Sequence, residues 1–410
     1  MLAAAVGAIP GRPPVTVTVA VDSSKHELTI TAGPYDLPNM PPMEDHAMMD
    51  LGMSHDTPVQ HFAWPVDGWF RGYRVDLADA QGRPVPRHVM HHMIMVNFSR
   101  RQLLYPAAER LMGAGTETDA EVTVPKTIGI PLSPGMQLGM YVAWHNDTGK
   151  PLEGVFLKVT MLWTPKNQNP RPVNSMPLYM DVNLTVGGSN TFDVPPGKSS
   201  KAYAFSLPIG GRLLGVGGHM HDYGVDVRLE DGESGKVLAR VTATRDAQGK
   251  VSKMSRKLFG VSGDGLKLEA NHPYRVVGEY DNPTGETKVK GAMAHMVALF
   301  VPDDMGKWPT IDPADPVYQR DLASLQVRGE PGAHGDMPGM ATDEANGHHG
   351  ASGHGGMDHD AMAHDSMPMD QGHTPEMKMD HGTMPHDTAT PAGLQPEADP
   401  ADSAGHGSHH

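Results

Sequence analysis

Short segments in which apolar and polar residues alternate with a period of two recur along residues 15–301. The first two, residues 15–21 and 26–31, are separated by Asp22-Ser23-Ser24-Lys25, which is typical of a hairpin. The other expected strands are residues 69–77, 93–97, 137–144, 153–163, 181–186, 202–207, 225–229, 236–243, 274–280 and 296–301. Gly, Pro, Asn or Asp separates them, so the pattern predicts an all-β chain of sandwich or jelly-roll type.

The domain division follows from a Pro- and Asn-rich segment that comes directly after an alternating strand, near residue 166. We expect two jelly-roll-like β-sandwich domains in tandem, residues 15–166 and 170–305, because each has an ordinary domain size. Residues 306–330 are expected to be a linker. Convincing amphipathic helices are scarce, and residues 101–112 are the best candidate in the body of the chain.

Residues 331–410 have a different composition, rich in His, Met, Asp, Gly and Pro and poor in large apolar side chains. Such a segment cannot form a core, so a disordered Met/His-rich tail is predicted. It contains thirteen acidic residues and one lysine, so that of the net charge of −15 only about −3 belongs to the rest of the chain. No basic surplus remains that would favour a nucleic-acid partner.

The chain has no cysteine, which excludes disulfides, thiolate metal sites and a cysteine nucleophile. Any metal must therefore be held by His, Met, Asp or Glu. Residues 1–14 form an N-terminal segment that opens with the apolar run MLAAAVGAI. This run is either the trimmed end of a signal peptide or a ragged start. No run approaches the roughly 20 apolar residues of a membrane-spanning helix, so no transmembrane segment is expected.

Histidines occur at strand-like positions. His219 and His221 lie two apart and would point the same way on a strand, whereas adjacent His91 and His92 need a bulge or strand end to act together. His145 follows an apolar strand. Each motif alone is as readily an ordinary hydrogen-bonded histidine as a ligand, and Met296 alone is typical of core packing.

In their order and spacing, these motifs resemble the copper type II, ascorbate-dependent monooxygenases, the family of peptidylglycine α-hydroxylating monooxygenase and dopamine β-monooxygenase. The resemblance covers residues 15–305 and includes a turn at Phe192-Asp193-Val194-Pro195-Pro196-Gly197 that is similar to the start of the family's second domain. It implies two copper ions per chain: His91, His92 and His145 would hold an electron-transfer copper, and His219, His221 and Met296 an oxygen-binding copper. His88, His295 and Met293 are alternatives beside these positions.

The resemblance implies hydroxylation of a C–H bond in a small-molecule substrate, with dioxygen and a reductant such as ascorbate. Imidazole binds copper in both oxidation states, and a thioether favours Cu(I). Gly217 stands where amidating members have an arginine for the substrate carboxylate, and Phe300 where a tyrosine is common. Both departures argue against a C-terminal glycine peptide as substrate. The missing cysteines indicate a bacterial-type member.

The tail resembles the metal-binding tracts of periplasmic copper-handling proteins, which favours a periplasmic or extracellular location. Its candidate ligands are His348, His349, Met357, His359, Met362, His364, Met367, Met369, Met377, Met379, His381, Met384 and His386. Residues 40–55 are a shorter copy of this chemistry, and a flexible solubilising extension is the plainer interpretation. An alternative function is therefore a non-catalytic copper-binding protein for storage, delivery or resistance, with other copper-handling proteins as partners. A structural β-sandwich without a metal would require all the motifs to be accidental.

Overall fold

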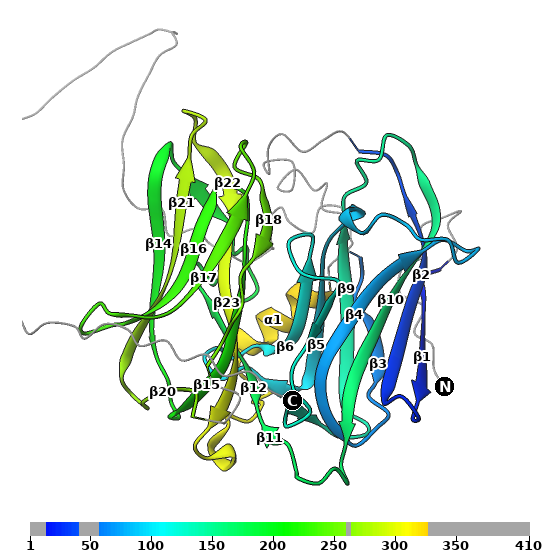
Figure 1. Cartoon of the computed structure of the whole chain (residues 1–410), viewed down its shortest axis with the longest axis horizontal. Helices are drawn as coiled ribbons and strands as arrows, with labels where there is room; N and C mark the ends of the chain where they lie inside the picture. The colour runs from blue at the N-terminus through cyan, green and yellow to red at the C-terminus, as the bar shows by residue number, and fades with distance from the viewer. Residues whose placement is uncertain (1–13, 41–56, 260–263, 327–410) are drawn as a thin grey trace, which may run out of the picture. The chain divides into compact units, whose positions relative to one another are not determined.

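The computed structural model describes residues 14–40, 57–259 and 264–326. These residues form four main β-sheets arranged as two sandwiches (Figure 1), so the all-β prediction is confirmed. Both sandwiches lie within the unit Met1–Thr342. The tail residues named above, residues 1–13 and residues 41–56 lie outside the described part. No helix in the described ranges is long and apolar enough to cross a membrane.

The first sandwich consists of a seven-stranded and a four-stranded sheet. The seven-stranded sheet contains β1 (Thr16–Asp22), β2 (Glu27–Leu37), β10 (Leu152–Pro165), β4 (Gly68–Ala78), β8 (Ile128–Leu132) and β11 (Val173–Asn174), with β7 (Glu121–Thr123) beside β4. The other contains β3 (Gln60–Ala63), β9 (Gln137–Trp144), β5 (Met90–Arg101) and β6 (Ala108–Gly115), with the 3-10 turn η2 (Arg87–Val89) before β5. Side chains of both sheets, among them Ile30, Val159, Met93 and Met140, form one core.

The second sandwich pairs two five-stranded sheets. One contains β12 (Met176–Asp181), β23 (Ala294–Pro302), β15 (Gly211–Met220) and β19 (Lys257–Leu258), with β20 (Leu266–Leu268) also paired to β15. The other contains β14 (Gly197–Ser206), β21 (Pro273–Asn282), β16 (Gly224–Asp231), β17 (Val237–Arg245) and β18 (Val251–Met254). The short strands β13 (Phe192–Val194) and β22 (Lys288–Ala292) pair separately, and η3 (Met305–Lys307) follows β23. Met180, Phe300, Val227 and Val276 belong to the second core.

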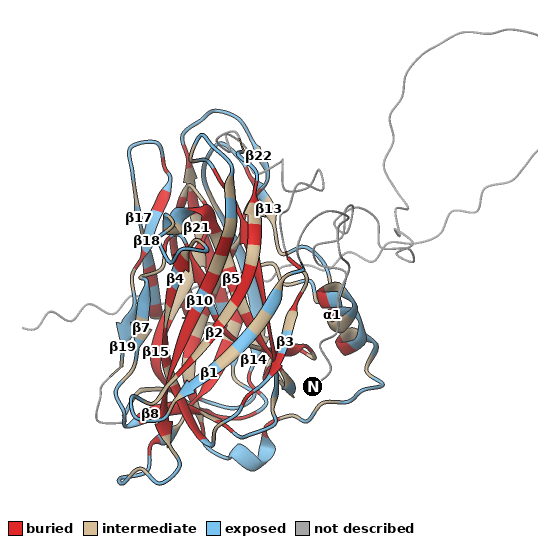
Figure 2. Cartoon of the chain, turned by 90° about the vertical axis from the view of Figure 1, so that its right-hand side faces the viewer, coloured by how far each residue is buried: buried red, intermediate tan, exposed pale blue. Residues whose placement is uncertain are grey.

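Buried residues lie mainly within the strands and exposed residues in the loops (Figure 2). In β23 buried and half-buried residues alternate along the whole strand, because successive side chains point to opposite faces of a sheet. One face of β23 therefore belongs to the second core. The other face carries Leu299, which packs against the first core, so this face lies towards the first sandwich.

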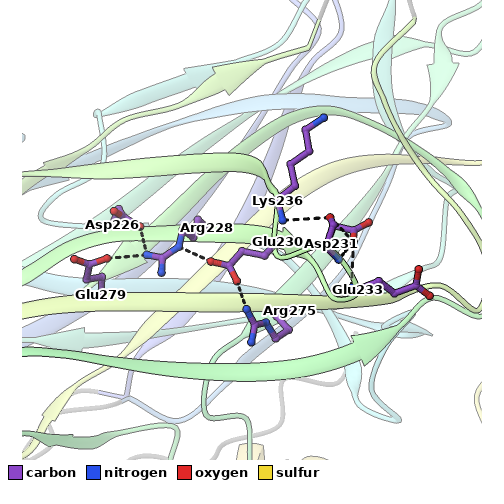
Figure 3. Close-up of polar contacts among 9 residues, drawn as sticks. Asp226, Arg228, Glu230, Asp231, Glu233, Lys236, Arg275 and Glu279 are labelled. Atoms are coloured by element: carbon purple, nitrogen blue, oxygen red, sulfur yellow. Dashed lines mark hydrogen bonds and ion pairs between the residues drawn. The ribbon is translucent and has the colours of Figure 1, made fainter. Parts of the chain in front are cut away.

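The outer face of β16 carries charged residues that neutralise one another (Figure 3). Arg228 lies between the carboxylates of Asp226 and Glu230 on its own strand and also reaches Glu279 of β21. Arg275 of β21 pairs with Glu230 at 2.6 Å. Arg240 of β17 also pairs with Asp226, so three guanidinium groups meet three carboxylates, and we assign this network a structural role.

Three expectations about individual segments are wrong. Residues 101–112 are not a helix, because they contain the end of β5, a loop and most of β6. The strand expected at 181–186 ends at Asp181 as β12. The segment 306–330 is not a plain linker, since it contains the helix α1 (Pro316–Gln326).

Helix α1 fastens the chain beyond the second sandwich to the first. Asp315 caps it by accepting from the N–H groups of Val317 and Tyr318. Tyr318 and Leu325 pack in a small apolar cluster with residues of β5 and β9. Asp321 is buried and makes a two-pronged ion pair with Arg110 of β6, at 2.5 and 2.8 Å. The helix therefore ties the two sandwiches together.

Candidate metal centre

The HxH motif lies at the end of β15, as the sequence predicted. Val216 and Met220 face the second core, so His219 faces the opposite side of the sheet. In the neighbouring strand β23, His295 pairs directly with His219, and their ring centroids are 5.1 Å apart. Asp181 of β12 is next in the row, opposite His295. Three adjacent strands thus place two imidazoles and a carboxylate on one face.

His221 continues the group one residue beyond β15. Its ring lies 5.2 Å from that of His219 and edge-on to it, and the residue is 6% exposed. Its backbone N–H donates to the carbonyl of Met293 at 3.1 Å, which places Met293 beside it, just before β23 begins. The Tyr280 hydroxyl donates to the same carbonyl at 2.7 Å and holds this connection in place.

The structure does not bring Met296 to these histidines. In β23 Met296 is the neighbour of His295 and so points to the other face, where it is fully buried in the second core. It lies opposite Gly218, at which a Cβ would come within 2.9 Å of the His295 carbonyl oxygen and of Val227. Met293 and His295, the alternatives from the sequence, are the residues that lie beside the HxH pair.

In the first sandwich, His91 and His92 begin β5. The pairing of β5 with β9 contains a bulge between Met90 and His92, which is the irregularity that two adjacent histidines need in order to act together. Their ring centroids are 5.0 Å apart. The ring of His91 also lies 6.0 Å from that of His221 in the second sandwich.

His145 and His88 lie near the same strand end. The backbone N–H of His145 donates to the Val89 carbonyl at 2.8 Å, so His145 is held next to the start of β5. His88 is 57% exposed, and its Nε2 lies 3.3 Å from Asp147. His88 thus belongs to an exposed ion pair, whereas His145 stays at the strand end where the sequence placed it.

His91, His92, His219, His221 and His295 form a continuous group of rings, which we call the histidine cluster. The resemblance implied two separate copper sites. Instead, His91 and His221 link the two halves. In the described ranges no three His, Asp or Glu residues converge well enough to hold a metal ion, so the expected trio of His91, His92 and His145 is not assembled.

The donor chemistry of the histidine cluster nevertheless fits copper. Imidazoles bind copper in both oxidation states, and Met293, whose backbone lies beside His221, offers a thioether, which favours Cu(I). Nδ1 of His295 is buried and has no hydrogen-bond partner within the described residues. Leaving such an atom unsatisfied costs about 1–3 kcal/mol, and metal binding would remove that cost. The histidine cluster thus offers donors suitable for copper in two pairs, His91 with His92 and His219 with His221.

A buried carboxylate governs the charge of the histidine cluster. Glu117, in the turn between β6 and β7, accepts a hydrogen bond from Nδ1 of His219 at 2.8 Å. Burial favours the neutral forms of both side chains. The attraction between the charged carboxylate of Glu117 and the charged imidazole of His219 outweighs this effect, so the pKa of Glu117 is held below its usual value and the pKa of His219 above it. Burial, helped by the charges of His219 and His92, lowers the pKa of His295 well below its usual value, which favours the neutral form of this ring.

Glu117 and Asp181 were missed in the sequence. Asp181 is buried, and its carboxylate accepts from the Tyr179 hydroxyl, the Asn183 N–H and the Asn190 side chain. Burial raises its pKa to about 6 despite these hydrogen bonds. No local signal distinguishes either acid from the chain's many exposed ones, because their role depends on strand pairing and on contact between the sandwiches.

No protein-family model matches this chain, and no curated protein does. Among solved structures, it is similar to the major capsid protein P2 from Bacteriophage PM2, with 10% identity, 66% of this chain and 98% of that chain covered, and a TM-score of 0.31. It is also similar to PNGF-II (9% identity, 67% and 66% covered, TM-score 0.35). A third similar chain is in the structure of Sulfolobus Turreted Icosahedral Virus (9% identity, 73% and 97% covered, TM-score 0.32). At such low values these likenesses assign no function.

Proposed function

We propose that this protein is a copper-dependent monooxygenase and that the histidine cluster binds its metal. The observation that carries the proposal is the contact of five imidazoles from β5, the end of β15 and β23, across both sandwiches, with His219 bonded to the buried carboxylate of Glu117. A group of histidines that only stabilised the fold would not need a neutral ring such as His295 with a buried, unsatisfied nitrogen.

In this proposal His219, His221 and Met293 would hold one copper ion, and His91 and His92 a second, with His145 at the adjoining strand end. Copper would supply the activation of dioxygen for hydroxylation of a C–H bond in a small substrate, with electrons from a reductant such as ascorbate. Glu117 keeps the proton of His219 on Nδ1, which leaves Nε2 as the ligand atom.

Copper binding is tested with the full chain, so that the tail is the same in every sample. Replacing both His219 and His221 by Ala should remove one copper ion per chain, measured by competition with a chelator of known affinity. The matched control is His272→Ala, because His272 forms an ion pair with Asp231 in the same sandwich and does not belong to the histidine cluster. Equal copper uptake by the double variant and the control would disprove binding at the cluster.

The monooxygenase assignment needs a second measurement. The copper-loaded chain should consume dioxygen with ascorbate, and one class of small molecule should raise this rate and gain a hydroxyl group. The double variant should lose the substrate-dependent part, because dioxygen can no longer meet copper at the histidine cluster.

Non-catalytic copper handling is the second candidate function. The linked arrangement of His91 and His221 favours it, since one continuous group of donors suits capture and exchange of the ion. Gly217 also favours this second function, because it offers no side chain to bind a substrate. The Arg256 side chain lies 3.6 Å from where a Cβ at this position would be. Copper bound at the histidine cluster without substrate-dependent dioxygen consumption would support this function.

A further inference from the structure

We propose that Tyr179, Tyr105 and Tyr203 form a one-electron relay between the histidine cluster and the protein surface. This inference rests on the proposed function, because the relay has a role only if a redox-active metal binds at the cluster. It assigns a protective and electron-supplying path to residues outside the set of metal ligands.

The geometry of the rings carries the proposal. The ring of Tyr179 in β12 lies 4.9 Å from that of His295, and the ring of Tyr105, in the loop between β5 and β6, lies 6.3 Å from Tyr179. Tyr203 in β14 lies 6.2 Å from Tyr105. Tyr105 is 4% exposed and Tyr203 is 36% exposed. Four rings thus lead step by step from the cluster to solvent, and electrons pass readily between aromatic rings at near contact.

Oxidation of a tyrosine at neutral pH requires that its phenolic proton leave with the electron, because a protonated phenol radical is a strong acid. Tyr179 has a proton acceptor in place, since its hydroxyl donates to Asp181 at 2.6 Å. The other partners of this carboxylate, the Asn183 N–H and the Asn190 amide, are donors too. Asp181 is therefore held as an acceptor for the Tyr179 proton.

The same residue connects the next tyrosine. The backbone N–H of Asp181 donates to the hydroxyl oxygen of Tyr105 at 3.3 Å, so both phenols meet at Asp181. In the first step Tyr179 gives one electron to an oxidant at the histidine cluster and one proton to Asp181, leaving a neutral tyrosyl radical. Tyr105 then passes one electron and one proton to Tyr179, Tyr203 passes the same to Tyr105, and a reductant of the ascorbate class supplies both to Tyr203. The proton on Asp181 goes to the reduced oxidant at the histidine cluster, which balances the electron that this oxidant accepted. The oxidant is what copper and dioxygen generate there, as the proposed function supplies.

Such a path has a clear use in this molecule. When no substrate is present, an oxidant at the cluster would attack its own ligands, and a methionine such as Met293 converts to the sulfoxide. If Tyr179 donates an electron, the oxidant is reduced before it attacks the ligands. Mere interface packing would explain aromatic contacts, but it does not require a buried carboxylate placed to take the phenolic proton.

The first test uses the full chain without metal, so that it does not depend on copper binding. Flash-generated ruthenium(III) tris-bipyridine oxidises exposed tyrosine, and freeze-quenched samples are examined for tyrosyl radical by electron paramagnetic resonance. We expect a long-lived radical that falls several-fold in Tyr203→Phe, Tyr105→Phe and Tyr179→Phe. Tyr274→Phe is the matched control, because Tyr274 is a buried tyrosine of the same sandwich whose hydroxyl accepts a hydrogen bond from the backbone N–H of Glu269. Equal radical yields in all four variants would overturn the relay.

The second test uses copper-loaded chain with ascorbate and dioxygen and no added substrate. Mass spectrometry of the peptides that contain His219, His221 and Met293 should show several-fold more oxidation in Tyr179→Phe than in Tyr274→Phe. Equal oxidation in the two variants would also overturn the relay. If the metal-free radical follows the expected pattern but no copper binds, the proposed function fails and the tyrosine path remains as a property of the fold.

Discussion

Nδ1 of His219 lies 2.8 Å from Oε1 of Glu117, and the two residues belong to different sandwiches. His219 follows from the strand β15, whereas Glu117 lies in a turn more than 100 residues earlier. The charge of the histidine cluster therefore depends on how the two sandwiches are positioned, because this hydrogen bond forms only when they are in contact. Both are nearly buried, with side-chain exposures of 15% for His219 and 6% for Glu117, so solvent screens this pair only weakly.

We expect Glu117→Gln to weaken copper binding by about 10–100-fold, the usual cost of removing a carboxylate that orients a ligand histidine. Gln still fits the space but carries no charge to stabilise the metal-bound imidazole. The measurement is chelator competition on the full chain. Asp119→Asn is the control, because Asp119 lies two residues away and pairs with Lys253 at the surface. Equal affinities of the two variants would show that Glu117 does not orient a ligand.

Met293→Leu and Met296→Leu should behave differently. Met293 lies beside His221, so its replacement should lower Cu(I) affinity and leave the free energy of unfolding nearly unchanged. Met296 is fully buried in the second core, so its replacement should cost less than about 1.5 kcal/mol of stability and leave Cu(I) affinity unchanged. Chelator competition and urea unfolding measure the two effects. The reverse pattern would restore Met296 as the ligand.

The stability of the metal-free protein should depend on Asp181 between pH 4 and 7. Burial raises the pKa of this carboxyl to about 6 from its usual 3.8, so the folded state binds the proton more tightly than the unfolded state does. Its contribution therefore falls as pH rises through this window, by about 3 kcal/mol in total. Asp181→Asn removes this dependence, so the variant should gain stability relative to the natural chain as pH rises. Urea unfolding at several pH values tests this, and a constant difference would contradict it.

Asp321→Leu should lower the free energy of unfolding by about 3–5 kcal/mol, because it leaves the Arg110 guanidinium without its buried partner. Urea unfolding gives the value. The matched control is the double variant Arg110→Met with Asp321→Leu, which removes both charges and should recover most of the loss. A loss below about 1 kcal/mol in the single variant would mean that the pair behaves like an exposed one.

The sequence determined the fold class and most of the longer strands, because alternation with a period of two survives in any single strand. The strand at 137–144 was predicted with its bounds, and the bulge needed by His91 and His92 is present in β5. The sequence also contained the signal for α1, which we missed: Asp315 before Pro316 is a typical helix start. For residues 101–112 a helix was predicted where there is none. These residues include good helix formers, but the pairing of β6 with β5 overrides that preference.

For the candidate site too, some residues could be found from the sequence and others only from the structure. The local pattern singled out His91, His92, His219 and His221, since spacing along a strand sets which face a side chain takes. It could not decide between Met296 and Met293, because that depends on which face of β23 meets the core, and this follows from its register with β15. Nor could it find Glu117 or the row of tyrosines, whose neighbours come from distant strands. Only tertiary contacts between the sandwiches bring a carboxylate, five imidazoles and a proton acceptor together, since burial and charge at such a point are properties of the assembled layers.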